Sequence, residues 1–239
     1  LTLSKPSIGC FDVQTRNFDV VTQPAVSFTS NAPQCTNAAV NFTYTGSATI
    51  SYLWDFGVGA IPQSSTVQNP QGIIYSSSGT KTITLSINNG VCQQTITQSI
   101  TILTTPTANF SSTAPGCTGM TVDFTNTGTV SGTTWLWNFG SGATPATSTA
   151  QNPAGVIYST SGTKVVTLTT TNTATGCTAF ATQTININET PAPAFTSTAP
   201  QCQGSAVTFA YTGTTGPGWT YAWDFGTSAS PAISSAQNP

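Results

Sequence analysis

Apolar and polar residues alternate with a period of two along most of the chain. In AVNFTYT (39–45), Val40, Phe42 and Tyr44 fall on one face of an extended segment and the residues between them on the other. The segments KTITLSI (81–87) and ISYLWDF (50–56) show the same alternation. Strict alternation over several residues predicts half-buried antiparallel strands, and no segment carries the 3.6-residue apolar stripe of a helix.

The alternating segments are short and are separated by Gly, Pro and Asn, which favour turns. This spacing predicts an all-β fold built from immunoglobulin-like sandwiches of about seven strands each. For one such unit we expect strands near residues 25–30, 38–45, 49–56, 72–76, 80–88 and 93–103.

The chain also repeats itself over long distances. Trp54, Trp137 and Trp223 follow one another at intervals of 83 and 86 residues, and the tripeptide QNP recurs at the same two intervals. Matches that keep their order over whole units indicate a tandem array. Both ends of the sequence look like cuts through a longer array. We therefore expect four parts: the last strands of a preceding repeat (1–22), two complete repeats (23–104 and 105–189) and the first half of a further repeat (190–239).

Composition excludes several function classes. Only 4% of the 239 residues are charged, four of them are Lys or Arg, and histidine is absent, so neither a nucleic-acid footprint nor histidine-based chemistry is expected. No apolar run is long enough to span a membrane as a helix. The acids are scattered and the cysteines lack paired C-x-x-C spacing, so we predict no catalytic group, metal site or cofactor; the acids are Asp12, Asp19, Asp55, Asp123, Glu189 and Asp224.

The three tryptophans lie in one recurring hexapeptide, written YLWDFG (52–57), WLWNFG (135–140) and YAWDFG (221–226). Each tryptophan shares its face with apolar neighbours, which predicts a core role; an exposed platform that stacks against sugars is the alternative. The following residue is Asp55, Asn138 or Asp224. A negative charge is therefore not required, and we expect this side chain to accept a hydrogen bond from a nearby turn.

Lys81 and Lys164 occupy equivalent positions just after a turn glycine. One interpretation is a lysine that protects a strand edge, or whose stem packs over a corner with its ammonium in water. The alternative is an isopeptide cross-link to Asp55 or Asn138.

A tryptophan-acid-Phe-Gly strand, then Asn-Pro, then Tyr-x-x-x-Gly-Thr and an alternating strand (as in 54–87) resembles the PKD (polycystic kidney disease) domain, which has an immunoglobulin-like fold. The chain departs from that family in having Lys81 and Lys164 where Tyr is common. A pair of cysteines in each unit is similar to PKD-like repeats of large surface proteins from Bacteroidota, including gliding adhesins.

Six cysteines in such a chain predict an oxidising, extracellular location. Bridges within each repeat, Cys35–Cys92 and Cys117–Cys177, are the ordinary expectation and the one we favour, because the loop NAPQC (31–35) looks long enough to fold back. In an immunoglobulin-like strand order, however, the two cysteines of one repeat lie at opposite ends of the sandwich, since a strand of ten residues spans on the order of 30 Å. The same geometry favours Cys35–Cys177, a bond between consecutive repeats.

These observations predict a non-catalytic repeat segment of a long secreted or cell-surface adhesin, acting as a stalk or spacer and as an adhesive surface. Its partners would be neighbouring repeats and surface polysaccharide or other cell-surface proteins. Two alternatives are an accessory, substrate-binding region of a secreted enzyme that degrades polysaccharide or protein, and a self-assembling extracellular filament.

Overall fold

The computed structural model describes residues 1–48 and 51–239, so the first two residues of the expected strand 49–56 lie outside the described residues. The described chain consists of strands and connecting loops, with one short 3-10 helix at Pro6–Ile8. Within these residues, no helix is both long and apolar enough to cross a membrane.

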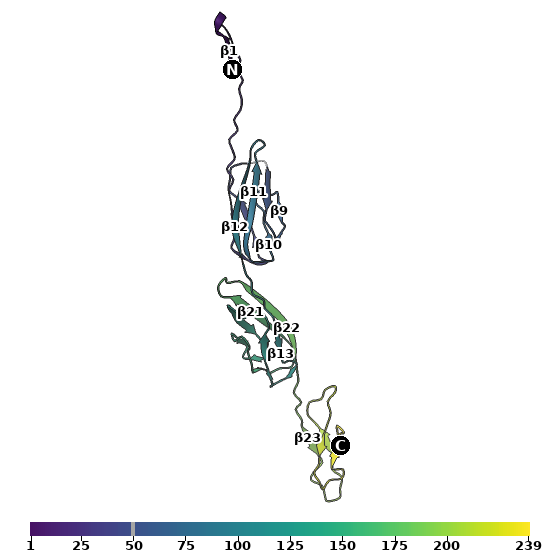
Figure 1. Ribbon diagram of the computed structural model, residues 1–239. Coiled ribbons are helices and arrows are strands. Elements are labelled where there is room, and N and C mark those ends of the chain that lie inside the picture. Colours follow the sequence, from purple (N-terminus) through teal and green to yellow (C-terminus); the bar gives the residue numbers. More distant parts are fainter. Residues whose placement is uncertain (49–50) are drawn as a thin grey trace. The chain divides into compact units, whose positions relative to one another are not determined.

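The first repeat contains a five-stranded sheet. Its two long strands, β11 (Gly79–Asn88) and β12 (Gln93–Leu103), form a hairpin (Figure 1). In this hairpin Gly79 lies opposite Ile102 and Asn88 lies opposite Gln93. The strand β7 (Ser51–Asp55), which carries Trp54, pairs with the other edge of β11. Two short strands complete the sheet at its outer edges: β4 (Gln34–Cys35) beside β12 and β9 (Ser64–Ser65) beside β7.

Two smaller sheets contribute the remaining strands of this repeat. One pairs β3 (Phe28–Ser30) with β6 (Phe42–Tyr44), and the other has the order β5 (Ala39–Val40), β10 (Ile73–Tyr75) and β8 (Ala60–Ile61). Their inward residues pack against those of β7, β11 and β12 in one apolar core, as the alternation predicts.

The second repeat has the same strand order. Its large sheet runs β14 (Gly116–Cys117), β22 (Thr178–Asn188), β21 (Gly162–Asn172), β17 (Thr133–Asn138) and β19 (Thr147–Ser148). The smaller sheets pair β13 (Phe110–Ser112) with β16 (Phe124–Asn126), and order β15 (Thr121–Val122), β20 (Val156–Tyr158) and β18 (Ala143–Thr144). The chain is thus a tandem array of immunoglobulin-like β-sandwiches, which confirms the fold class.

The two ends of the chain hold shorter arrangements. Near the N-terminus, β1 (Thr2–Lys5) and β2 (Cys10–Val13) form an antiparallel hairpin. In residues 190–239, β23 (Phe195–Ser197) pairs with β24 (Phe209–Tyr211), and β25 (Trp223–Asp224) pairs with β26 (Ile233–Ser234).

The sequence analysis did not predict three strands of the first repeat: β4, β8 and β9, each of two residues. Such short strands contain no alternation of their own, and each forms because a longer strand lies beside it. The strand β4 also departs from the antiparallel expectation, because Gln34 and Cys35 pair in parallel with Ile102 and Leu103.

Candidate functional site

The tryptophans of the two complete repeats lie in the sandwich cores. Trp54 and Trp137 are both 0% exposed. Each indole N–H donates a hydrogen bond to a backbone carbonyl thirteen residues further on, Val67 and Ala150 respectively, at 2.9 Å. In these two repeats the ring therefore has no free face on which a sugar could stack.

Three phenylalanines surround each buried tryptophan. The ring centroids of Phe28, Phe42 and Phe56 lie 5.0, 5.6 and 6.0 Å from that of Trp54. In the second repeat the corresponding distances from Trp137 are 5.2, 5.8 and 6.0 Å. The hexapeptide supplies the tryptophan and one phenylalanine of each cluster, and the same arrangement recurs around Trp223 in residues 190–239.

The residue after each tryptophan accepts a hydrogen bond from the turn that follows. The side-chain oxygens of Asp55, Asn138 and Asp224 accept from the backbone N–H two residues later, at 2.8, 2.9 and 2.9 Å. An amide oxygen and a carboxylate oxygen do this equally well. The expected role as a turn acceptor is confirmed, and it explains why the acid varies.

The lysines pack against tyrosine rings. Lys81 donates to the Ser77 hydroxyl at 2.9 Å and lies 5.7 Å from the centre of the Tyr75 ring. Lys164, only 4% exposed, donates to the Thr160 hydroxyl at 2.7 Å. Lys81 lies where β11 pairs with β12 only, since the pairing of β11 with β7 begins at Thr84, so edge protection stays a prediction. The ring contacts agree with a lysine stem packed over a corner, but the ammonium of Lys164 does not lie in water, because this residue is 4% exposed.

These lysine contacts do not favour the isopeptide alternative. The hydroxyl groups of Ser77 and Thr160 take the ammonium hydrogen bonds that the structure shows. The oxygens of Asp55 and Asn138 accept from the turn glycines instead.

Buried tyrosines close the same corner of each sandwich. The Tyr75 and Tyr158 hydroxyls donate to the carbonyls of Phe56 and Phe139, at 2.8 and 2.9 Å. Burial raises the pKa of both phenols to about 12, and the nearby Asp55 carboxylate adds to this effect at Tyr75. Ionising either phenol would therefore oppose folding.

One disulfide is present, and it joins Cys35 to Cys177 with a Cα–Cα distance of 5.8 Å. Cys35 lies in the first repeat, whereas Cys177 precedes β22 at the tip of the long hairpin of the second. The residues of that tip, Thr171–Ala179, belong to the same compact unit as residues Leu1–Thr107. The favoured pairing within repeats, Cys35–Cys92 and Cys117–Cys177, is wrong.

Strand register explains the correction. Cys35 lies opposite Leu103 at one end of β12, and Cys92 immediately precedes Gln93 at the other end. The strand has 11 residues, so the two cysteines are on the order of 35 Å apart at about 3.3 Å per residue. The loop does not fold back, because Gln34 and Cys35 are themselves paired with β12.

The other four cysteines carry free thiols: Cys10, Cys92, Cys117 and Cys202. Cys117 occupies the place in the second repeat that Cys35 has in the first, since β14 pairs in parallel with the end of β22 as β4 does with β12. Cys92 likewise corresponds to Cys177. The free thiols are therefore the counterparts of cysteines that are bonded elsewhere in the chain.

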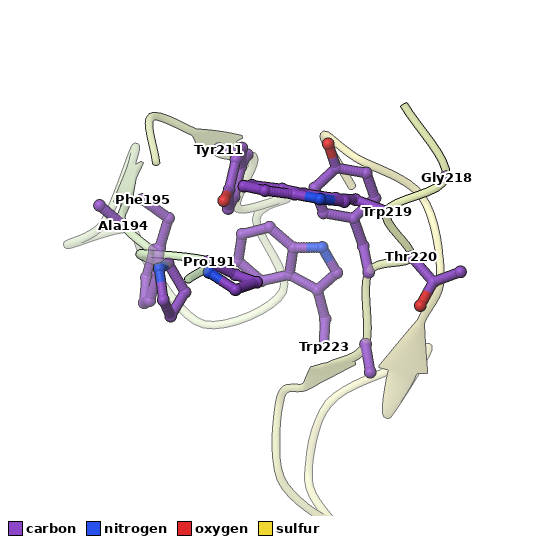
Figure 2. A pocket seen from close by; sticks show the side chains of 11 residues that line it. Pro191, Ala194, Phe195, Tyr211, Gly218, Trp219, Thr220 and Trp223 are labelled. Atoms are coloured by element: carbon purple, nitrogen blue, oxygen red, sulfur yellow. The ribbon is translucent and has the colours of Figure 1, made fainter. Parts of the chain in front are cut away.

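An aromatic groove opens in the half-repeat 190–239. It has a volume of about 570 Å³ and is lined by proline, alanine and aromatic side chains, with the rings of Phe195, Tyr211, Trp219 and Trp223 gathered around it (Figure 2). Trp223 corresponds to Trp54 and Trp137 but is partly exposed. The corresponding residues of the first repeat, Phe28, Tyr44 and Trp54, are buried in its core, and residues 190–239 contain no counterparts of β10, β11 and β12.

The acidic residues do not assemble into a site. Among the residues described, no three or more Asp, Glu, Cys or His side chains gather where they could hold a metal ion. Asp123, for example, accepts a hydrogen bond from the Gly155 backbone at 2.8 Å, a structural role.

Residues 103–187, which span the second repeat, match the model of the PKD domain. This match supports PKD-like repeats of immunoglobulin fold, as the sequence resemblance implied. No curated protein matches the chain.

Solved structures similar to the chain include the D00-D0 domain of Intimin, at 12% identity, with 67% of this chain and 99% of that one covered and a TM-score of 0.31. The fibronectin(III)-like modules of Clostridium thermocellum CbhA are 9% identical, with 68% and 95% covered and a TM-score of 0.31. The chicken CNTN1 FN1-FN3 domains are 11% identical, with 79% and 75% covered and a TM-score of 0.29.

Proposed function

We propose that the chain is a non-catalytic stalk segment of a secreted or cell-surface adhesin, built to carry tension. PKD-type and immunoglobulin-like domains typically perform no catalysis, which agrees with this assignment. Its partners would be neighbouring repeats and, at an adhesive surface, polysaccharide or other cell-surface proteins. The observation that carries the proposal is the Cys35–Cys177 bond between consecutive repeats.

The position of this bond decides how a pulling force passes through the chain. Tension that enters from the N-terminal side reaches Cys35 on β4 and crosses directly to Cys177, which precedes β22. The residues between them, including both buried tryptophans, lie in a closed loop that bears no tension. Most core residues of the two repeats lie in this loop, whereas Phe28, Ile185 and Ile187 lie outside it and remain on the path of the tension.

The disulfide also supports an extracellular location, because structural disulfides form and persist outside the reducing cytosol. The low share of charged residues, 4%, suits the same setting. Both observations agree with the surface-protein assignment.

Single-molecule pulling between residues 1 and 239 tests the proposal. The loop closed by the bond has a sequence separation of 142, so reduction should release about 500 Å of additional chain at about 3.5 Å per residue. In the oxidised protein this length should not contribute to the extension, even when the cores unfold. The variant Cys117→Ser, which removes a free thiol, should behave as the unaltered protein does. Equal extension of oxidised and reduced protein would contradict the proposal.

A further inference from the structure

The long strand β22 has one edge that no other strand covers over most of its length. Within the described residues, β14 pairs with β22 only at Ile187 and Asn188. The preceding stretch, 178–186, has no strand on that side. Beside part of this stretch lies a groove of about 600 Å³, lined by residues that include Phe110 and Pro115, so the edge is open to an approaching chain.

Hydrogen bonds next to the two ends of β22 show which backbone groups face this edge. The carbonyl of Asn188 accepts from Thr118 on the β14 side, and the carbonyl of Cys177 accepts from Asn172 on the β21 side. Alternate residues of a strand direct both their N–H and their C=O to the same side. The even-numbered residues therefore face the open edge: Thr178, Phe180, Thr182, Thr184 and Asn186.

This edge lacks the features that normally keep sheet edges apart. Exposed edges are commonly protected by charged side chains, especially Lys, or by Pro. The strand β22, with the sequence TAFATQTININ, contains neither a charged residue nor a proline. The formal net charge of the whole chain is only −2 at pH 7, so charge repulsion between copies is weak. Electrostatics therefore does not prevent this edge from meeting an identical one.

We propose that two copies of this chain pair through the free edge of β22, antiparallel and centred on Thr182, so that their large sheets join into one. In this register Thr182 lies opposite Thr182 of the second copy, Phe180 opposite Thr184, and Thr178 opposite Asn186. Opposite residues of a hydrogen-bonded pair exchange both bonds, so every edge-facing N–H and C=O of the stretch gains a partner. A register centred on any other residue leaves some of these groups unpaired.

Exposed apolar side chains fit the same register. Phe180 is 77% exposed, and Val165, on the neighbouring strand β21, is 52% exposed. The hydroxyls of Thr167 and Thr182 lie 3.2 Å apart, so these two residues face each other and Val165 faces Thr184. Phe180 of the second copy lies on the other side of Thr184. The pairing thus places its ring beside Thr184 and towards Val165, and it lowers the exposure of these side chains.

The β12 edge of the first repeat has the same backbone arrangement but lacks this aromatic side chain. Its Thr97 corresponds to Thr182, because β4 and β14 pair at equivalent ends of β12 and β22. The counterpart of Phe180 is the polar Thr95. The apolar side chains therefore assign the pairing to β22, and β12 provides matched control positions.

Sedimentation equilibrium tests the association. The background is a variant whose free cysteines are replaced by serine, so that no disulfide can form between copies: Cys10→Ser, Cys92→Ser, Cys117→Ser and Cys202→Ser. The 24.5 kDa chain should show a concentration-dependent equilibrium between monomer and dimer. A chain that stays monomeric up to its solubility limit would overturn the proposal.

Proline substitutions distinguish the two edges. Thr182→Pro removes the central N–H from the free edge and leaves the bonds to β21 in place, and edge strands tolerate such a proline. The dissociation constant of the dimer should rise about tenfold or more, because the two central hydrogen bonds between the copies are lost. Thr97→Pro, the matched control in β12, should leave this constant unchanged. Equal effects of the two prolines would overturn the proposal.

Lysine substitutions give a second comparison that does not disturb a strand. Phe180→Lys replaces an exposed side chain, so folding should be unaffected, but it removes the apolar contact and places like charges at the pairing edge. The dissociation constant should again rise about tenfold. Thr95→Lys, at the counterpart position in β12, should have no effect. A dimer that is insensitive to Phe180→Lys would overturn the proposal.

Cysteine substitutions in the same background test the register. Opposite residues of a hydrogen-bonded pair have Cα atoms about 5.5 Å apart, which is within reach of a disulfide. With glutathione disulfide as the oxidant, Thr182→Cys should therefore give a covalent dimer. Thr184→Cys should not, because the two substituted positions lie about 13 Å apart along the strands. A covalent dimer of Thr184→Cys, or none of Thr182→Cys, would overturn the proposal, whereas failure of the pulling experiment would leave it unaffected.

Discussion

The complete repeats and the half-repeat contain the same aromatic cluster, but its rings differ in their exposure to water. Phe110 and Trp137 lie 5.2 Å apart at 72°, and so do Phe195 and Trp223. Phe110 is nevertheless 3% exposed and Phe195 59% exposed. Local strands therefore place the rings, whereas the long hairpin that follows them in the sequence removes the rings from water.

The cysteines show a parallel difference. Cys35 and Cys117 have the same place in consecutive repeats, yet one is bonded and the other is a free thiol. Residues 1–239 include the hairpin cysteine of the following repeat for Cys35, namely Cys177, but not the one for Cys117. Burial and bonding thus both depend on the neighbouring hairpin, and this dependence can be tested position by position.

The largest effect should come from the disulfide. The sequence separation of 142 gives a loop-entropy estimate of about 5 kcal/mol, so Cys35→Ser should lower the free energy of unfolding by up to this amount. Cys117→Ser, at the matching unbonded position, should leave it unchanged. Denaturant unfolding followed by circular dichroism under oxidising conditions measures both. Equal losses for the two variants would show that the bond does not act as described.

The tryptophans should show the second largest effect. Truncating a fully buried tryptophan costs about 3–5 kcal/mol, so Trp54→Ala and Trp137→Ala should each destabilise their own repeat by this amount. Trp223→Ala should leave the unfolding of both complete repeats unaltered. Denaturant unfolding followed by circular dichroism measures these changes in stability. A large loss of stability from Trp223→Ala would mean that the half-repeat stabilises the complete repeats.

Alkaline pH should lower the stability of the two complete repeats, because each contains a buried tyrosine whose ionisation opposes folding. The pKa of Tyr75 and Tyr158 is raised from 10.0 to about 12, so the folded state holds the phenolic proton more tightly than the unfolded state. This contribution is fully present below pH 10 and is lost as the pH rises towards about 12. The midpoint of thermal unfolding should fall across that window.

The double variant Tyr75→Phe with Tyr158→Phe provides the control. It loses two buried hydrogen bonds, each worth about 1 kcal/mol, but its thermal midpoint should depend less on pH above 10. A variant with the same alkaline slope as the unaltered protein would rule out these two phenols as its source.

The smallest effect should come from the residue after each tryptophan. Asp55→Asn should be close to neutral, because Asn138 performs the same function in the second repeat. Asp55→Ala removes the acceptor and should cost about 1 kcal/mol. The unfolding free energies of the two variants decide this, and a costly Asp55→Asn would mean that the charge matters.

Features that depend on local residues were accessible from the sequence. Alternation placed the long strands, and the exchange of Asp55 for Asn138 identified a turn acceptor. The strands β4, β8 and β9 could not be predicted, because each has two residues and exists through its pairing partner. The favoured pairing within repeats was wrong because the parallel pairing of Cys35 with Leu103, 68 residues away in sequence, prevents the loop from folding back. Strand geometry alone favours the alternative Cys35–Cys177, which is the bond present.

Peptide mapping of the oxidised protein without reduction tests the central claim most directly. If consecutive repeats are joined as the structure shows, the peptide containing Cys35 will be recovered linked to the one containing Cys177. Recovery of Cys35 linked to Cys92, with Cys117 linked to Cys177, would contradict the account.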